Sequence, residues 1–288
     1  MPYVYLIVSV FLSAGASVFS KLFNCQNVGR KDSTAFYNFL FTTSVALGWG
    51  VFYVFDFSFE LTVLWYAIGF GLCFTACNIG LINAMKYGSA ALTSLFVSLS
   101  LILTTAWGFL FWNAELTLPV GIGLALVVLS IVCCLYSKDK DRKGFSWKWL
   151  FFALLACFGN AACSILQRSQ QIRFHGEHGS MLMLFATTIS AVACLCIYLK
   201  SDKTDSLKLL KKSAYAPVFA SVCNITANFL IMLIATTSLS PSLVYPVIGV
   251  GSLGVVILFS LFAFKEKIRK IQWLGLAFGA VAIALLSV

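Results

Sequence analysis

Charged side chains are scarce in this sequence of 288 residues. Only 10% of the residues are Asp, Glu, Lys or Arg, whereas 60% are hydrophobic. A soluble domain carries about 25% charged residues, so the composition excludes an ordinary cytosolic protein. The 20 basic residues outnumber the 10 acidic ones, which in a soluble protein would suggest nucleic acid. Because this chain is so apolar, we expect its basic residues to face the lipid bilayer on the cytoplasmic side, and we expect no binding of nucleic acid.

Histidine is nearly absent, and the cysteines lack the spacing of a metal site. His175 and His178 lie in one short loop without the helical His-Glu-x-x-His frame. The ten cysteines lack the paired motifs of a zinc site, so we predict no metal and no cofactor. No Ser/His pair and no intramembrane pair of Asp residues supplies a nucleophile with its base. The sequence therefore predicts that the protein is not an enzyme.

Long stretches without charge define the expected membrane spans. A helix needs about 20 apolar residues to cross a bilayer, and continuous apolarity favours helices over a β-barrel. The longest stretch divides near Pro241, which suits the first turn of a new helix. The sequence thus predicts an all-α membrane protein with ten spans, with Trp49, Trp65 and other aromatic residues as anchors at the interface. The charge-free stretches are 2–20, 33–55, 61–85, 87–114, 116–137, 149–167, 179–199, 213–264 and 271–288.

The two halves of the chain contain similar segments, 150 to 152 residues apart. Residues 89–115 correspond to 240–266, and Asn78 corresponds to Asn228. Five spans is an odd number, so the second half must enter the membrane in the opposite orientation. Such inverted repeats are found in many secondary transporters, with the substrate site near the midplane. The expected parts are a first five-helix repeat at 1–137, a basic cytoplasmic connection at 138–148 and a second five-helix repeat at 149–288.

Short motifs recur in part in the two halves, and Ala90 and Leu95 of the first half replace two prolines of the second. In the second half they are Asn228, Pro241, Pro246, Glu266, Gly275 and Gly279, and in the first half Asn78, Glu115, Gly121 and Gly123. This pattern resembles the ten-helix metabolite and amino-acid exporters (EamA type) of the drug/metabolite transporter superfamily. The resemblance implies two five-helix repeats and transport of a small-molecule substrate.

Amides within the spans are candidates for binding that substrate. Polar groups are costly in lipid and tend to face the bundle interior or a cavity. The repeat places one amide from each half near the pseudo-twofold axis, and amides both donate and accept hydrogen bonds, which suits a zwitterionic or polar metabolite. The alternative is that these amides only bind neighbouring helices. The candidate substrate-binding residues are Asn78, Asn228, Asn224, Asn160, Tyr245 and Lys21.

Two of these candidates have a second interpretation each. Lys21 ends the first charge-free stretch, where it either extends to the interface or neutralises a substrate carboxylate at the cavity mouth. Arg168 ends the sixth expected helix in the equivalent place. Tyr245 and Pro246 either break the ninth helix and free backbone groups for substrate, or form a simple kink.

None of the ten acidic residues lies in the middle of a span. Small four-helix drug exporters of the same superfamily use an embedded Glu in their first helix to exchange protons for cations. This chain has no such residue, and its absence argues against that mechanism here. Facilitated diffusion, substrate exchange, and coupling through Glu115 and Glu266 stay open. For these two glutamates the alternative is a structural role at helix ends.

The basic residues predict an orientation. Eighteen of the 20 lie in alternate connections, and the other two are Arg168 and Arg173. The positive-inside rule places those connections in the cytoplasm and both termini outside the cell membrane. Many members of the resembled family have cytoplasmic termini, so the resemblance and the charge count disagree, and we prefer the charge count.

Together these patterns predict a secondary transporter of small polar metabolites, such as amino acids, that works by alternating access in the export direction. One alternative is a flippase for lipid-linked or amphipathic substrates. Another is a membrane scaffold that transports nothing. The sequence leaves the oligomeric state open and favours a monomer.

Overall fold

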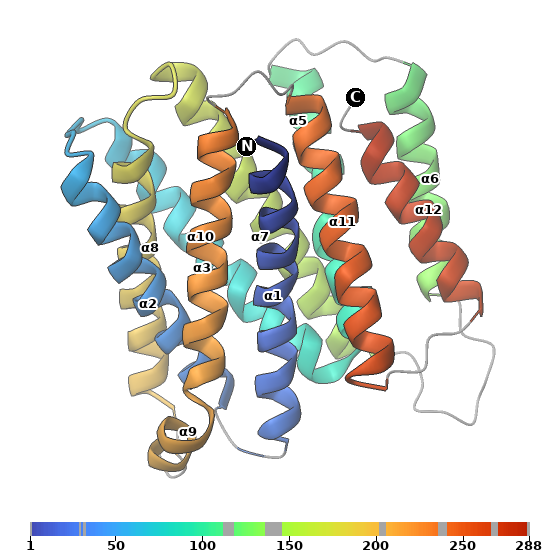
Figure 1. Ribbon diagram of the computed structural model, residues 1–288, viewed down its shortest axis with the longest axis horizontal. Coiled ribbons are helices and arrows are strands. Elements are labelled where there is room, and N and C mark those ends of the chain that lie inside the picture. Colours follow the sequence, from blue (N-terminus) through green and yellow to red (C-terminus); the bar gives the residue numbers. More distant parts are fainter. Residues whose placement is uncertain are drawn as a thin grey trace.

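The computed structural model consists of helices packed side by side, roughly along one common direction (Figure 1). No strand occurs among the residues that it describes, so the predicted all-α class is confirmed. The described residues are 2–28, 30, 33–111, 118–135, 146–201, 206–235, 241–265 and 270–286.

All but one of the helices follow the charge-free stretches of the sequence. In chain order the helices are α1 (Pro2–Gln26), α2 (Ser33–Phe55), α3 (Val63–Tyr87), α4 (Ala90–Ser98), α5 (Ser100–Phe111), α6 (Leu118–Leu135), α7 (Trp147–Arg173), α8 (Gly179–Leu199), α9 (Ser206–Ser213), α10 (Tyr215–Ala235), α11 (Pro241–Phe262) and α12 (Lys270–Leu286). The exception is α9, which lies in a basic connection that contains Lys208, Lys211 and Lys212.

Five of these helices, α1, α2, α3, α7 and α8, are long and apolar enough to cross a membrane. The expected division near Pro241 is confirmed, because α11 begins at that residue. The expected fourth span differs from the prediction: it is interrupted at Leu99, where α4 ends and α5 follows. The structure therefore supports an apolar helical bundle, and the number of ten spans stays a prediction.

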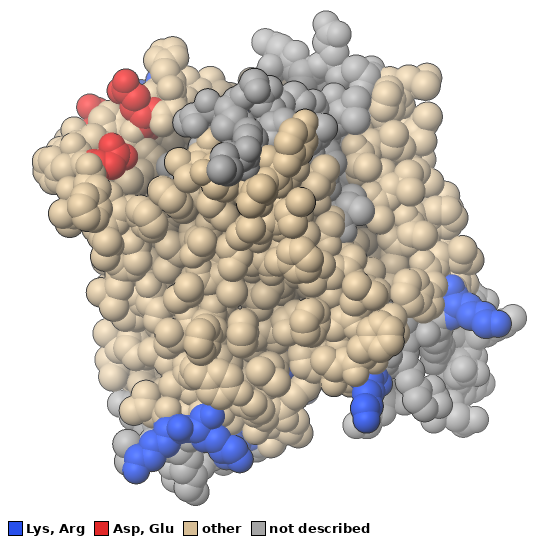
Figure 2. Space-filling view, in the orientation of Figure 1, with Lys and Arg blue, Asp and Glu red and all other residues tan. Residues whose placement is uncertain are grey.

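On the face shown in Figure 2, the described residues around the middle of the bundle carry no charge, and charged residues lie at its two ends. Leu47, Val54 and Trp65 are each at least 70% exposed, as expected for helices that face lipid. We call the two ends basic and acidic. Exposed residues of the basic end are Lys86, Lys148, Lys200, Lys211, Lys212, Lys265 and Lys270. The described residues of the acidic end include Asp56, Glu60 and Glu177.

Helix contacts follow the relationship between the two halves. The repeat pairs α1 with α7, α2 with α8, α3 with α10, α4 and α5 with α11, and α6 with α12. Exchanging the halves turns the extensive α1–α10 contact into the α7–α3 contact, which is also extensive. The α2–α8 and α6–α12 contacts join equivalent helices directly. This is the packing expected of a pseudo-twofold arrangement.

Glycine permits the closest of these approaches, between α3 and α7. A Cβ atom on Gly80 would lie 2.6 Å from the backbone nitrogen of Ala156, and one on Gly159 would lie 2.8 Å from the backbone nitrogen of Cys77. Both distances are shorter than any real Cβ contact, so only glycine lets the two backbones come this near. The close crossing brings the polar face of α7 to the centre of the molecule.

Candidate functional site

Polar residues from several helices meet around a central cavity of about 390 Å³. This volume lies within the range of about 300–1,000 Å³ that is usual for small-molecule sites. Amides, hydroxyls and apolar side chains all contribute to its wall. The lining residues are Ser13, Ala16, Ser17 and Ser20 of α1, Tyr37 and Phe41 of α2, Asn78, Leu81 and Ile82 of α3, Val97 of α4, Asn160 of α7, Asn224, Ala227, Asn228 and Ile231 of α10, and Ile248 of α11.

The central cavity lies on the pseudo-twofold axis, because equivalent residues of both halves line it. Asn78 and Asn228 are 150 residues apart, and so are Leu81 and Ile231. Val97 and Ile248 are equivalent at 151 residues, and Ser13 and Asn160 at 147. The offset of 147 residues also relates the last residues of α1 and α7, Gln26 and Arg173. A cavity between two related halves is the place where secondary transporters bind substrate.

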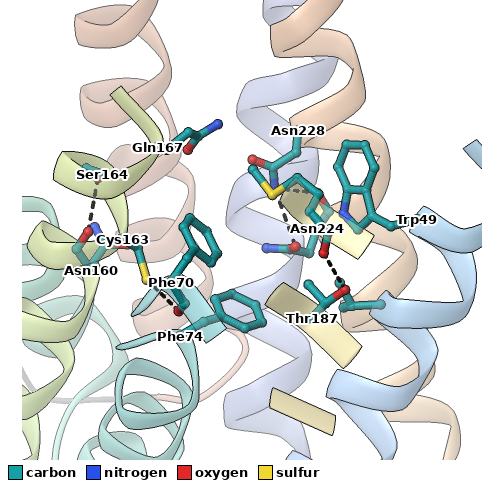
Figure 3. Close-up of a pocket in the computed structure, with 12 residues that line it drawn as sticks. Trp49, Phe70, Phe74, Asn160, Cys163, Ser164, Gln167, Thr187, Asn224 and Asn228 are labelled. Carbon is teal, nitrogen blue, oxygen red and sulfur yellow. Dashed lines mark hydrogen bonds between the residues drawn. The ribbon is translucent and has the colours of Figure 1, made fainter. Parts of the chain in front are cut away.

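A second cavity of about 210 Å³ extends from the first toward the acidic end. The two share Asn160, Asn224 and Asn228, so these amides lie where the cavities meet. Figure 3 shows Asn160 and Gln167 on one side of this second cavity, with Asn224 and Asn228 on the other. Its complete lining is Val45, Trp49, Phe70, Phe74, Asn160, Cys163, Ser164, Gln167, Met183, Thr187, Asn224 and Asn228.

The wall of each cavity uses the same positions of equivalent helices. On α1 the central cavity is lined at positions 13, 16, 17 and 20, and on α7 the second cavity is lined at 160, 163, 164 and 167. Adding 147 to each of the first four numbers gives the second four. Tyr37 and Phe41 of α2 correspond in the same way to Met183 and Thr187 of α8, at an offset of 146. Equivalent helix positions therefore line the two cavities, α1 and α2 in the central cavity and α7 and α8 in the second, but the side chains at these positions differ.

A third cavity, of about 150 Å³, branches from the central one and is rich in hydroxyl groups. It shares Ser13 and Ser17 with the central cavity and adds Ser94, Ser98 and Ser252. None of the described residues that line the three cavities carries a charge. The walls therefore provide neutral hydrogen-bond donors and acceptors beside apolar surface.

Hydrogen bonds hold the central amides while leaving groups available to a solute. The Nδ2 atom of Asn78 donates to the carbonyl oxygen of Phe74 at 2.8 Å, and that of Asn228 donates to the carbonyl oxygen of Asn224 at 2.8 Å. The bond of Asn78 uses one of the two N–H donors of its amide. Asn228 Nδ2 also donates to Asn224 Oδ1 at 3.3 Å, so Asn228 donates twice to the same neighbour. The Nδ2 atom of Asn160 donates to Ser100 Oγ at 2.8 Å, next to the interruption at Leu99. These bonds fix the orientation of the side chains, and Asn78 keeps a second N–H donor for a solute.

The structure brings together four of the six predicted substrate-binding residues: Asn78, Asn160, Asn224 and Asn228 all line the central cavity. Tyr245 lies in α11, and its side chain is outside the described part of the chain.

Lys21 does not line any of the three cavities. Its Nζ atom donates to the carbonyl oxygens of Met85 and Gly88, at 2.9 and 2.7 Å, at the C-terminal end of α3. Lys21 is thus committed to a helix end, because the last carbonyls of a helix have no intrahelical partner and attract a positive charge. The possible coupling residues Glu115 and Glu266 lie outside the described residues.

The aromatic part of the site was not predicted. Trp49, expected at the membrane interface, is 2% exposed and lines the second cavity together with Phe70 and Phe74. Tyr37 and Phe41 line the central cavity. The equivalence of Tyr37 to Met183 and of Phe41 to Thr187 is visible in the sequence once the repeat is extended to the second helix of each half. Burial of Trp49 follows from the packing of α2 on α8 and α10, which the sequence does not display.

Comparison with known proteins agrees with this architecture. The sequence model of the EamA-like transporter family matches residues 1–136 and again residues 147–288. An uncharacterized protein of Haemophilus influenzae is 24% identical over 218 residues, which are 75% of this chain and 72% of that protein. One protein of known crystal structure has the same fold, with a TM-score of 0.61 at 15% identity over 96% of this chain and 95% of that chain. The family match covers both halves, so the chain belongs to the EamA-like transporter family, as its motifs predict.

Proposed function

We propose that the protein is a secondary transporter that exports small polar metabolites, amino acids or similar solutes, across the cell membrane by alternating access. Family membership makes it a multi-pass membrane transporter of the drug/metabolite transporter superfamily. In the proposed architecture, ten spans form two inverted five-helix repeats, at 1–137 and 149–288, with a basic connection at 138–148 between them.

The central cavity is the observation that carries this proposal. Four pairs of equivalent residues surround it, so exchanging the conformations of the two halves would leave the solute at the same place. Access would then change from one end of the bundle to the other around a fixed site, which is the geometry of alternating access.

The chemistry of the wall favours a solute without net charge. A charged solute would lose its hydration in this cavity without meeting an opposite charge on a described lining residue. Asparagine amides can hydrogen-bond both charged groups of a zwitterion, because one side chain donates to a carboxylate and accepts from an ammonium group. The phenyl groups of Phe41, Phe70 and Phe74 offer apolar surface to the rest of the solute.

Counterflow of radiolabelled amino acids into proteoliposomes tests the proposal. We expect uptake by the purified protein, and we expect Asn78→Ala and Asn228→Ala to slow it about three- to tenfold each, since a neutral hydrogen bond contributes about 0.5–1.5 kcal/mol. Asn83→Ala is the matched control: Asn83 lies on α3, donates to the carbonyl oxygen of Ile79 and lines none of the three cavities.

Two results would contradict the proposal. Transport at the wild-type rate by both Asn78→Ala and Asn228→Ala would remove these amides from the binding site. No counterflow of any amino acid by the folded wild-type protein would contradict the substrate class, and vesicles carrying a fluorescent lipid would then test the flippase alternative.

A further inference from the structure

At the basic end, three neighbouring residues of α1 donate or share hydrogen bonds with other helices. Ser20 Oγ lies 2.6 Å from Tyr37 Oη of α2. Lys21 Nζ donates to the carbonyl oxygens of Met85 and Gly88, as described above, and Asn24 Nδ2 donates to the carbonyl oxygen of Ile82 at 2.8 Å. We call Ser20, Lys21 and Asn24 the basic-end latch.

The basic-end latch closes the central cavity on this side. Ser20, Tyr37 and Ile82 are among the lining residues of that cavity, and all three are buried. Lys21 and Asn24 follow on the same helix, one and four residues nearer the basic end, and are also buried. The latch thus holds α1 against the end of α3 between the central cavity and the basic end.

The corresponding residues of α7 have similar chemistry. The offset of 147 residues that relates the cavity walls also relates Ser20 to Gln167, Lys21 to Arg168 and Asn24 to Gln171. A cation corresponds to a cation, and an amide to an amide. At the offset of 150 residues that relates α3 to α10, Ile82 and Met85 correspond to Met232 and Ala235, in the last turn of α10.

The two sets of residues differ in their surroundings. Lys21 is 9% exposed, whereas Arg168 is an exposed residue. Within the described part of the chain, no hydrogen bond or ion pair is formed by the side chains of Gln167, Arg168 or Gln171. Gln167 lines the second cavity, on the acidic side of the central amides. The latch is therefore formed by α1, whereas the equivalent side chains of α7 form no such bonds with the described residues.

We infer that Lys21 and Arg168 are alternating gate residues. In the present state Lys21 holds α1 against the end of α3 and closes the basic end. In the opposite state α7 closes on the last turn of α10, Arg168 binds the carbonyl oxygen of Ala235, and Lys21 releases its carbonyl partners. The C-terminal end of a helix carries a partial negative charge that attracts a cation, so the same kind of interaction stabilises the two states in turn. The inference rests on alternating access, which is part of the proposed function.

Hydrogen exchange followed by mass spectrometry on the full chain in lipid nanodiscs tests the inference. Lys21→Met removes the latch at the basic end. We expect exchange at residues 82–88 to become at least about tenfold faster, the factor for loss of one hydrogen bond to a charged group. At the same time we expect exchange at residues 228–235 to become slower, because the acidic end is closed more of the time.

Arg168→Met is the reciprocal variant. It removes the partner of the opposite state, so we expect slower exchange at residues 82–88, where exchange requires the basic end to open. The double variant Lys21→Met, Arg168→Met weakens both states, and we expect the ratio of exchange rates at the two ends to return toward the wild-type ratio. Lys21→Arg keeps the charge and should behave as wild type.

A purely structural cap gives a different result. If Lys21→Met loosens only residues 82–88 and leaves 228–235 unchanged, or if Arg168→Met changes neither end, the alternating gate is wrong. Should Lys21→Met not fold, Ser20→Ala removes the milder bond to Tyr37 and must shift the two ends in the same opposite directions. The measurement needs no substrate. Reciprocal exchange without amino-acid counterflow would therefore contradict only the proposed substrate, and counterflow without reciprocal exchange would contradict only the gate.

Discussion

At the scale of single residues, a shift of one or two turns along α1 changes what a polar side chain does. Ser13 and Ser17 line the central cavity, whereas Lys21, one turn farther, binds the end of α3. Both kinds of residue appear in the sequence as polar groups within or beside an apolar run. Their roles differ because the cavity ends where α1 meets α3.

Asn160 combines a place at the junction of two cavities with a structural bond, and the two roles can be separated. Asn160→Ala removes the amide from the cavity, and we expect counterflow to fall about three- to tenfold, in line with one neutral hydrogen bond. Ser100→Ala removes only the acceptor of the 2.8 Å bond. We expect it to keep transport within about twofold of wild type.

An equal loss of transport in the two variants would show that Asn160 acts through its bond to Ser100 and not through the cavity. Thermal unfolding of both variants provides the accompanying stability measurement, so that a loss of folded protein is not taken for a loss of binding.

At the scale of helices, the crossing of α3 and α7 sets the position of the site. Gly80 and Gly159 allow the two backbones to approach, and Asn78 and Asn160 lie beside these glycines on the two helices. A side chain at the crossing would separate the helices and with them the amides. The distance between α3 and α7 at this crossing therefore determines the positions of Asn78 and Asn160 in the cavity wall.

Gly159→Ala should destabilise the protein for this reason. Its Cβ atom would lie 2.8 Å from the nitrogen and 3.0 Å from the Cα atom of Cys77, and backbone cannot move aside as a side chain can. We expect a loss of about 1–3 kcal/mol, as for overpacking in other cores, seen as a lower midpoint of thermal unfolding. Gly254→Ala on α11 is the control, because nothing lies within 4 Å of its added Cβ atom. A midpoint for Gly159→Ala as high as that of Gly254→Ala would disprove the expected clash.

At the scale of the whole molecule, the separation of charges relates the fold to the membrane. Exposed lysines gather at one end of the bundle, while Asp56, Glu60 and Glu177 lie at the other (Figure 2). The lysines at the helix ends and in the connections are distant in sequence, but packing of the helices places them at the same end of the bundle. This basic end is the one that the positive-inside rule assigns to the cytoplasm.

The orientation can be measured in intact cells with a membrane-impermeant maleimide. We expect a cysteine introduced at residue 1 to be labelled from outside, and Lys200→Cys at the basic end to be protected until the membrane is opened. The wild-type chain, with its ten native cysteines, gives the background. Labelling of the Lys200→Cys protein from outside, with protection at residue 1, would reverse the assignment and agree with the cytoplasmic termini of relatives.

Much of the architecture follows from the sequence alone. Runs without charge predict the helices because a charge is costly in lipid, and Pro241 marks the start of α11 because proline suits a first helical turn. The repeat relates Asn78 to Asn228, which the structure places around one cavity. These features depend on local composition and on spacing, which a sequence displays directly.

Other features were decided by the tertiary structure. The sequence does not show that Trp49 is buried in the second cavity or that the fourth expected span is interrupted at Leu99. Nor does it show that Lys21 is bound to a helix end while Arg168 is exposed. Each depends on which surface of a helix meets a neighbour, and in lipid apolar residues suit every surface equally well. Only the close packing of particular helices determines which residues line a cavity, which bind another helix and which face lipid.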